Sequence, residues 1–170
     1  MSGSGVAVVV GNPQAESRTA GIAMKVGERL GTLLGSASPA LIDLAQQPEG
    51  LLRWKDPGVE AWRSTVLGSR ALVVASPTFK ASFTGLTKLF LDTFGAGELG
   101  GVPTVALMTG GSADHSLAVQ VHLTPVLTEI GASCPARGLY VGGPAVDDPD
   151  PAIDEWWAAA ESAFRRALAD

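Results

Sequence analysis

The feature that most constrains the fold is a run of five apolar residues, Val6–Val10, that ends abruptly. An uninterrupted apolar strand is typical of a parallel sheet that is covered by helices on both faces. Gly11, Asn12 and Pro13 follow it, and glycine and proline do not continue a strand. Beyond residues 17–19 the spacing of apolar residues becomes helical. The chain therefore begins with a buried strand, a polar loop and a helix.

The polar loop before this helix suits an anion. Ser17, Arg18 and Thr19 supply two hydroxyls and a guanidinium at the expected helix start. Free backbone N–H groups and the helix dipole also favour negative charge at a helix N-terminus. The sequence therefore predicts a phosphate site here. The alternative is that Ser17 serves as a helix N-cap with nothing bound.

Length and composition narrow the class of protein. The chain has 170 residues, of which 46% are hydrophobic, so we expect a single domain over residues 1–170 with a well-filled core. A net charge of -5 argues against nucleic acid as a partner, and no apolar run is long enough to span a membrane. The N-terminus lacks a signal-peptide pattern, and a lone Cys134 excludes an internal disulfide, so a cytoplasmic location is expected. Cys134 itself is expected to pack as a small apolar residue.

Strand-like runs alternate with helical patterns along the whole chain. The expected strands are residues 6–10, 40–44, 71–75, 104–108 and 135–141. The expected helices are residues 17–34, 59–67, 82–94, 116–130 and 152–168, and Pro125 should kink the fourth of them. This alternation predicts an α/β fold with a doubly wound five-stranded parallel sheet and helices on both faces. The flavodoxin-like order 2-1-3-4-5 fits best, because strands one, three and four are wholly apolar and belong in the interior.

Three loops should meet at one edge of such a sheet, because ligands bind at the carboxyl ends of the strands where the strand order reverses. The first is the loop at residues 11–17. The second carries Pro77, Thr78, Phe79 and Lys80, which provide a restricted turn, a flat aromatic ring and a cation. The third carries Thr109, Gly110, Gly111 and Ser112, where glycine lets the backbone approach a ligand closely. Each loop alone could be an ordinary turn, but together they would frame a planar ring.

Motifs that are missing narrow the ligand further. Neither GxGxxG nor GxxxxGK[ST] follows the first strand, so a dinucleotide or P-loop site has no support and a mononucleotide phosphate remains. His115 would lie near the ring, either contacting it or forming a local hydrogen bond. His115 and His122 without a nearby carboxylate cluster do not make a metal site. The acidic run at residues 147–150 lacks EF-hand spacing and should be an exposed loop before the last helix.

Three segments carry a resemblance to a known family: residues 11–19 (GNPQAESRT), 76–92 (SPTFKASFTGLTKLFLD) and 109–127 (TGGSADHSLAVQVHLTPVL). On these segments the chain resembles the NADPH-dependent FMN reductases, notably those that serve two-component alkanesulfonate monooxygenases. The resemblance implies hydride transfer from NADPH or NADH to FMN, with reduced FMN supplied to a partner monooxygenase. It implies an FMN site made of Gly11, Asn12, Pro13, Ser17, Arg18, Thr19, Pro77, Thr78, Phe79, Lys80, Thr109, Gly110, Gly111, Ser112 and His115.

Within that set, the resemblance implies that Ser17, Arg18 and Thr19 hold the phosphate and that the other two loops surround the ring. No catalytic residue is expected, because hydride transfer between nicotinamide and flavin is the chemistry of the cofactors. Negative charge that develops on the flavin would be met by backbone N–H groups at residues 110–112, or second by Lys80.

The resemblance also bears on assembly. Family members associate through the helices after the second and third loops, which implies a homodimer or homotetramer through residues 82–94 and 116–130. The chain departs from the family pattern in having Phe79 where tyrosine is frequent. Val121, next to His122, stands where the alkanesulfonate reductases insert a tyrosine that influences flavin release. FMN could therefore be an exchanged substrate or a tightly held prosthetic group.

Three other functions share these features. The first is a quinone or azo-compound reductase with bound FMN, and the second is an electron carrier of the flavodoxin type. The third is a flavin-binding module without enzymatic activity. Flavodoxins flank the ring with an acidic surface and two aromatic residues, whereas the loops here offer Phe79 alone, which argues against the carrier.

Overall fold

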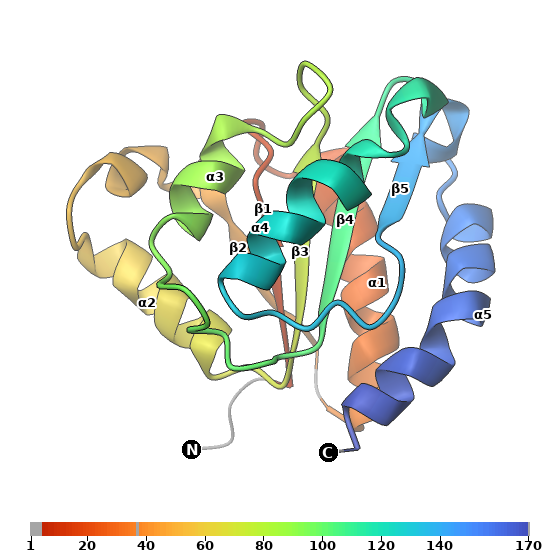
Figure 1. Cartoon of the computed structure of the whole chain (residues 1–170). Helices are drawn as coiled ribbons and strands as arrows, with labels where there is room; N and C mark the ends of the chain where they lie inside the picture. Colours follow the sequence, from red (N-terminus) through yellow and green to blue (C-terminus); the bar gives the residue numbers. More distant parts are fainter. Residues whose placement is uncertain (1–4, 37, 170) are drawn as a thin grey trace.

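A computed structural model describes residues 5–36 and 38–169 of the chain (Figure 1). Its five strands form one parallel sheet in the order β2-β1-β3-β4-β5, which confirms the expected order and class of fold. Strands and helices alternate along the chain as β1 (Val6–Val10), α1 (Arg18–Leu34), β2 (Ala40–Asp43), α2 (Pro57–Leu67), β3 (Ala71–Pro77), α3 (Gly85–Leu91), β4 (Thr104–Gly110), α4 (Thr124–Glu129), β5 (Leu139–Gly142) and α5 (Asp150–Ala167).

Helices cover both faces of the sheet, as Figure 1 shows, and each face has its own apolar core. Val8 and Val10 of β1 point into the core shared with α1 and α5. Val9, between them in sequence, points into the core shared with α2, α3 and α4. Successive side chains of a strand point to opposite faces, so a strand buried on both faces has to be apolar at every position.

The register of the sheet brings the carboxyl ends of the inner strands to one edge. Val10 of β1 is level with Ala75 of β3, and Pro77 of β3 is level with Thr109 of β4. Gly110 of β4 is in turn level with Gly142 of the edge strand β5. The loops that follow β1, β3, β4 and β5 therefore leave the sheet side by side.

The segment after β3 differs from the expectation. β3 extends through Pro77, and the helix expected at residues 82–94 is limited to α3, Gly85–Leu91. Thr84 caps α3, since its Oγ1 accepts a hydrogen bond from the Thr87 N–H at 3.1 Å. Phe79 and Ser82 exchange two backbone hydrogen bonds and close a tight hairpin before that cap. Residues 82–84 therefore belong to the loop.

The helix expected at residues 116–130 is broken, as its proline suggested. A 3-10 turn at Ala113–His115 and a π-helical turn at Val119–Leu123 precede α4. Pro125 has no N–H to bond to a carbonyl four residues earlier. The Thr124 N–H donates instead to the carbonyl of Val119, five residues earlier, which is the π-helical pattern.

The fifth strand was predicted to begin too early. Residues 135–138 use their polar backbone groups outside the sheet: the Gly138 N–H donates to Gln120 Oε1 at 3.3 Å, and the Arg137 carbonyl accepts from Trp156. β5 begins at Leu139. No helix in the described parts of the chain is long and apolar enough to cross a membrane.

Candidate functional site

A cleft of about 360 Å³ lies at the carboxyl ends of the inner strands. All three loops singled out from the sequence contribute to it. Ten of the fifteen predicted site residues line this cleft, and they are Asn12, Ser17, Arg18, Thr19, Pro77, Thr78, Phe79, Thr109, Gly110 and Gly111. The structure thus brings together residues from the first strand loop and from loops that follow it much later in the sequence.

The other five predicted residues, Gly11, Pro13, Lys80, Ser112 and His115, do not line the cleft. Gly11 is buried behind it, and its carbonyl accepts a hydrogen bond from Thr84 Oγ1 at 2.5 Å. A Cβ at Gly11 would lie 1.9 Å from Thr87 Oγ1, so glycine is needed there for packing. This contact fixes the first loop against the start of α3.

The start of α1 offers free donors to an anion. Ser17 is its N-cap, with Oγ accepting from the Ala20 N–H at 3.2 Å, so Ser17 caps this helix as the sequence allowed. The cap leaves the backbone N–H groups of Arg18 and Thr19 without an acceptor among the described residues. A helix N-terminus with free N–H groups and a guanidinium beside it is suited to phosphate, because both carry positive charge toward the ligand.

Arg18 already has an anionic partner in the protein. Its Nη1 lies 2.5 Å from Oδ1 of Asp147, which follows the 3-10 turn Gly143–Val146. Both side chains are exposed to solvent, 69% for Arg18 and 72% for Asp147. Arg18 is the one basic side chain among the described residues that line the cleft, and Asp147 offsets its charge there.

The floor of the cleft is a buried hydroxyl pair. Thr19 Oγ1 and Thr109 Oγ1 are 2.8 Å apart and lie on α1 and β4 respectively. Asn12 Nδ2 donates to the same Thr19 oxygen at 3.2 Å. This chain of bonds connects the first loop to the third beneath the space that a ligand would fill.

One buried atom on the cleft wall is unsatisfied. Thr78 Oγ1 has no hydrogen-bond partner, and it is the one such buried side-chain N or O atom found in residues 5–36 and 38–169. A buried polar atom without a partner costs free energy, so such atoms are rare unless a ligand or water satisfies them. The backbone of Thr78 is fixed, since its N–H donates to the Thr109 carbonyl at 2.6 Å. The Thr78 hydroxyl is therefore available to a polar atom of a ligand in the cleft.

Two adjacent glycines of the third loop have different surroundings. A Cβ at Gly110 would lie 2.1 Å from Tyr140 Oη, so there is no room for a side chain at that position. A Cβ at Gly111 would have no atom within 4 Å, so that position faces open space in the cleft. Tyr140 holds the loop from behind, donating to the Ser112 carbonyl at 2.7 Å. The open face beside Gly111 is where a flat ligand can approach the backbone.

The second loop projects from the edge of the sheet as a hairpin, which Figure 1 shows after β3. Phe79 is 54% exposed and lines the cleft. Lys80 and Ala81 form the turn with φ values of 51° and 63°, a conformation that side chains other than glycine adopt at a cost. Lys80 lies at this turn, is exposed and is not among the residues that line the cleft.

Three cleft residues were missed from the sequence: Gln14, Gly143 and Val146. Gly143 and Val146 follow β5, whose carboxyl end lies at the same edge as the other strands. The rule that located the first three loops applies equally to this fourth one. Gln14 lies within the first loop and could have been included by position.

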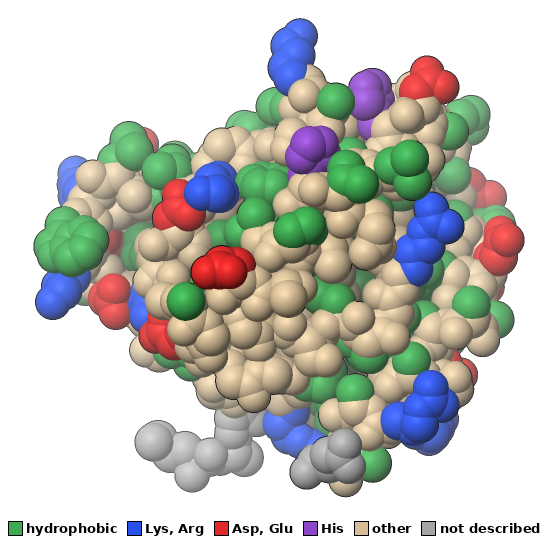
Figure 2. Space-filling model, in the orientation of Figure 1, with side chains coloured by type: hydrophobic (Ala, Val, Ile, Leu, Met, Phe, Trp, Pro, Cys, Tyr) green, Lys and Arg blue, Asp and Glu red, His purple; other side chains and the backbone are tan. Residues whose placement is uncertain are grey.

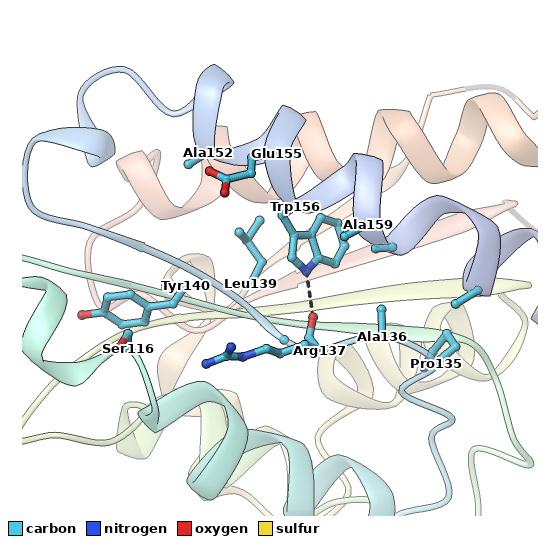
Figure 3. A pocket seen from close by; sticks show the side chains of 13 residues that line it. Ser116, Pro135, Ala136, Arg137, Leu139, Tyr140, Ala152, Glu155, Trp156 and Ala159 are labelled. Carbon is cyan, nitrogen blue, oxygen red and sulfur yellow. Dashed lines mark hydrogen bonds between the residues drawn. The ribbon is translucent and has the colours of Figure 1, made fainter.

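A larger cavity of about 600 Å³ lies elsewhere, between residues 135–140 and α5 (Figure 3). Trp156 of α5 points across it and donates from Nε1 to the Arg137 carbonyl at 2.7 Å. Alanine side chains form much of its lining, and it shares no lining residue with the cleft. The cleft is smaller, but it alone of the two combines free backbone donors, a cation and an unsatisfied hydroxyl.

The thiol and the histidines do not form a reactive group. Cys134 is half-buried against the core, and burial raises its pKa to about 11, which keeps it a neutral thiol at pH 7. His115 and His122 are exposed, and no metal-binding cluster of three ligand residues occurs in the described chain. The packing of Cys134 confirms the sequence-based expectation.

The surface beside the cleft carries several exposed apolar side chains. Leu89 of α3 is 37% exposed, and Leu117 and Val121, before α4, are 60% and 57% exposed. Figure 2 shows hydrophobic side chains spread over this face, where α3 and α4 lie in Figure 1. A second group stands at the turn between β2 and α2, where Leu52 and Trp54 are 76% and 91% exposed.

Comparison with known proteins agrees with the geometry. The sequence pattern of the NADPH-dependent FMN reductases matches residues 5–145. The NADH-dependent FMN reductase SfnF of Pseudomonas putida is 30% identical over 147 residues, which cover 84% of this chain and 79% of that protein. The FMN reductase (NADPH) of Escherichia coli K12 is 33% identical over 103 residues, 59% of this chain and 54% of that one. A solved oxidoreductase of Corynebacterium diphtheriae superposes with a TM-score of 0.78 at 29% identity, covering 96% of both chains.

Proposed function

The chain belongs to the family of NADPH-dependent FMN reductases, and from that membership we propose that it catalyses hydride transfer from NADPH or NADH to FMN bound in the cleft. The observation that carries this proposal is the cleft itself. It joins a helix N-terminus with free N–H groups and Arg18 at one end to the unsatisfied Thr78 hydroxyl at the other. A flavin mononucleotide needs both ends, one for its phosphate and one for the polar atoms of its ring.

The protein's own contribution is position and electrostatics. Bound FMN supplies the hydride acceptor, and no acid–base pair of the chain is required for that chemistry. Arg18 and the α1 N-terminus would hold the phosphate. The backbone N–H groups of Gly111 and Ser112 donate to no acceptor within the described residues, and they would stabilise negative charge on the reduced ring. Lys80, at the turn of the hairpin, has less support for that role than these two groups.

The experiment that tests this function follows nicotinamide absorbance at 340 nm. The purified protein should oxidise NADPH or NADH rapidly when FMN is added and slowly without it. Comparing the rates of NADPH and NADH oxidation identifies the preferred hydride donor, since the relatives include an NADH-dependent and an NADPH-dependent reductase. The proposal fails if added FMN produces no oxidation of either nucleotide and does not bind to the protein.

We also propose that reduced FMN is released to a flavin-dependent monooxygenase. The support is the accessibility of the cleft: Phe79 and Gly111 are exposed, and Arg18 lies at the surface. An open site allows FMN to exchange as a substrate. Ultrafiltration separates the two states of the cofactor, because an exchanging FMN passes the filter at low protein concentration and a prosthetic FMN stays with the protein.

A homodimer or homotetramer through the face around α3 and α4 is proposed as well. The exposed side chains of Leu89, Leu117 and Val121 support it, since a cluster of large apolar side chains on one face is typical of an interface. Light scattering should give a mass at least twice that of one chain. Val121→Asp should shift it toward the monomer, and Trp54→Asp, on the separate exposed group, should not.

A further inference from the structure

Three exposed ion pairs connect α1 with α5 and with Asp147, which precedes α5. In order along α1 they are Arg18–Asp147, Lys25–Asp150 and Arg29–Asp154. The second and third pairs join α1 to α5, and none of their four residues lines the cleft. The first differs, because its cation is also the basic side chain of the cleft.

We infer that Asp147 sets the affinity of the site for the FMN phosphate by competing for the guanidinium of Arg18. This inference rests on the proposed function, since it concerns the phosphate end of the same cleft. In the free protein Arg18 is paired with Asp147, so the charges of the two side chains cancel at that end. The phosphate has to share or displace this carboxylate to use the guanidinium.

The strength of the pair suits such an exchange. Both partners are more than two-thirds exposed, and exposed ion pairs stabilise proteins only slightly, because water screens them and both side chains lose freedom. A single bond, from Nη1 to Oδ1, joins them. A phosphate dianion at the helix N-terminus offers the guanidinium more charge and more acceptors than one carboxylate oxygen. Arg18 can therefore turn from Asp147 to the ligand at little cost.

The position of Asp147 links this exchange to a wall of the cleft. Asp147 directly follows the turn Gly143–Val146, and both Gly143 and Val146 line the cleft. The ion pair ties this wall to the start of α1 in the free protein. Asp147 is thus a positioning residue: it is not among the residues that line the cleft and acts through Arg18 and this turn.

The test is the binding of two flavins that differ in the phosphate alone. Flavin fluorescence titration of the flavin-free protein gives the dissociation constants of FMN and riboflavin for wild type and for Asp147→Asn. The substitution should lower the dissociation constant of FMN about two- to fivefold, which is the effect of removing one exposed ion pair that opposes binding. The dissociation constant of riboflavin should stay unchanged. Asp147→Glu, which keeps the carboxylate, should bind FMN within about twofold of wild type.

Two variants with the same change of net charge serve as controls. Asp148 is next to Asp147, is exposed and forms no ion pair within the described chain. Asp154 forms the third of the ion pairs above, with Arg29. Asp148→Asn and Asp154→Asn should both leave the dissociation constant of FMN unchanged. In an Arg18→Ala background, Asp147→Asn should also have no effect, because its action goes through the guanidinium.

Each other outcome overturns the inference. Unchanged or weaker FMN binding by Asp147→Asn shows that the carboxylate does not compete. An equal gain for riboflavin, or for FMN in Asp148→Asn, shows that net charge or loop structure is responsible. These failures leave FMN reduction by wild type intact. A wild-type protein that binds neither flavin instead overturns the proposed function, and this inference with it.

Discussion

The hydroxyls of Thr19 and Thr109 lie 2.8 Å apart in the buried floor of the cleft, although 90 positions separate them in sequence. One belongs to the first turn of α1 and the other to the end of β4. The bond connects the loop proposed to hold the phosphate with the loop proposed to hold the ring. The two halves of the site are therefore held at a fixed separation by the fold itself.

Replacing Thr109 with valine removes this bond while keeping the shape of the side chain. The free energy of unfolding should fall by about 1 kcal/mol, since the buried Thr19 hydroxyl loses one of its two partners. FMN should bind several-fold more weakly. Thr104→Val is the matched control: it removes a hydroxyl from the other end of β4, bonded to the Val102 carbonyl, and should lower stability without changing FMN binding. Urea unfolding and flavin titration measure the two effects, and equal FMN affinity in both variants would contradict the prediction.

Arg18→Ala and Ser17→Ala should both weaken the binding of FMN, for different reasons. Loss of the guanidinium removes charge-assisted bonds to phosphate, each worth about 1.5–3 kcal/mol, so the dissociation constant should rise about tenfold or more. Ser17→Ala removes the N-cap of α1 and should also cost about 1 kcal/mol of stability. Riboflavin titrations are the check. If Arg18→Ala weakens the binding of riboflavin as much as the binding of FMN, the phosphate lies elsewhere.

Gly111→Val should abolish flavin binding without harming the fold. A Cβ at Gly111 meets no atom within 4 Å, so the valine side chain enters space that a ring would occupy. The thermal midpoint should stay close to that of wild type, while FMN-dependent oxidation of NAD(P)H is lost. Gly110→Val is the contrasting variant, because its Cβ would meet Tyr140 Oη at 2.1 Å and the protein should be destabilised. Retained turnover in folded Gly111→Val would refute the placement of the ring.

Cys134 should make stability depend on pH in the alkaline range. Burial raises the pKa of its thiol from 9.0 to about 11, so the folded protein holds the proton more firmly than the unfolded chain does. The resulting stabilisation is complete below pH 9 and is lost as the pH rises toward 11. Urea unfolding of wild type and Cys134→Ala at pH 8 and pH 11 should show the difference in stability shrinking at the higher pH. A difference that stays constant would contradict the shifted pKa.

Much of this architecture could be predicted from the sequence, because its strongest signals are local. Val6–Val10 and residues 71–75 are apolar at every position, and that pattern has few interpretations other than a central parallel strand. Rules for connecting parallel strands then allowed few orders. The ten predicted residues that line the cleft lie where the same kind of rule places ligand sites, at the carboxyl ends of such strands.

The features that could not be predicted depend on contacts distant in sequence. The start of β5 was misplaced because Gly138 and Arg137 bond to Gln120 and Trp156, partners that no local pattern reveals. The pairing of Arg18 with Asp147 spans 129 positions and depends on how α5 packs beside α1. Pro125 indicated that the helix is irregular, but the π-helical form of that irregularity depends on which carbonyl Thr124 reaches.

The strand order has a consequence for synthesis of the protein on the ribosome. β1 emerges early, yet its inner neighbour β3 ends only at Pro77, and the loop with Gly111 follows later still. A nascent chain that stops before β4 carries the α1 N-terminus but neither the Thr109 hydroxyl nor the open face beside Gly111. A ligand stabilises the folded site that it binds, so flavin held at the proposed site would stabilise the chain only after the fourth strand has joined the sheet.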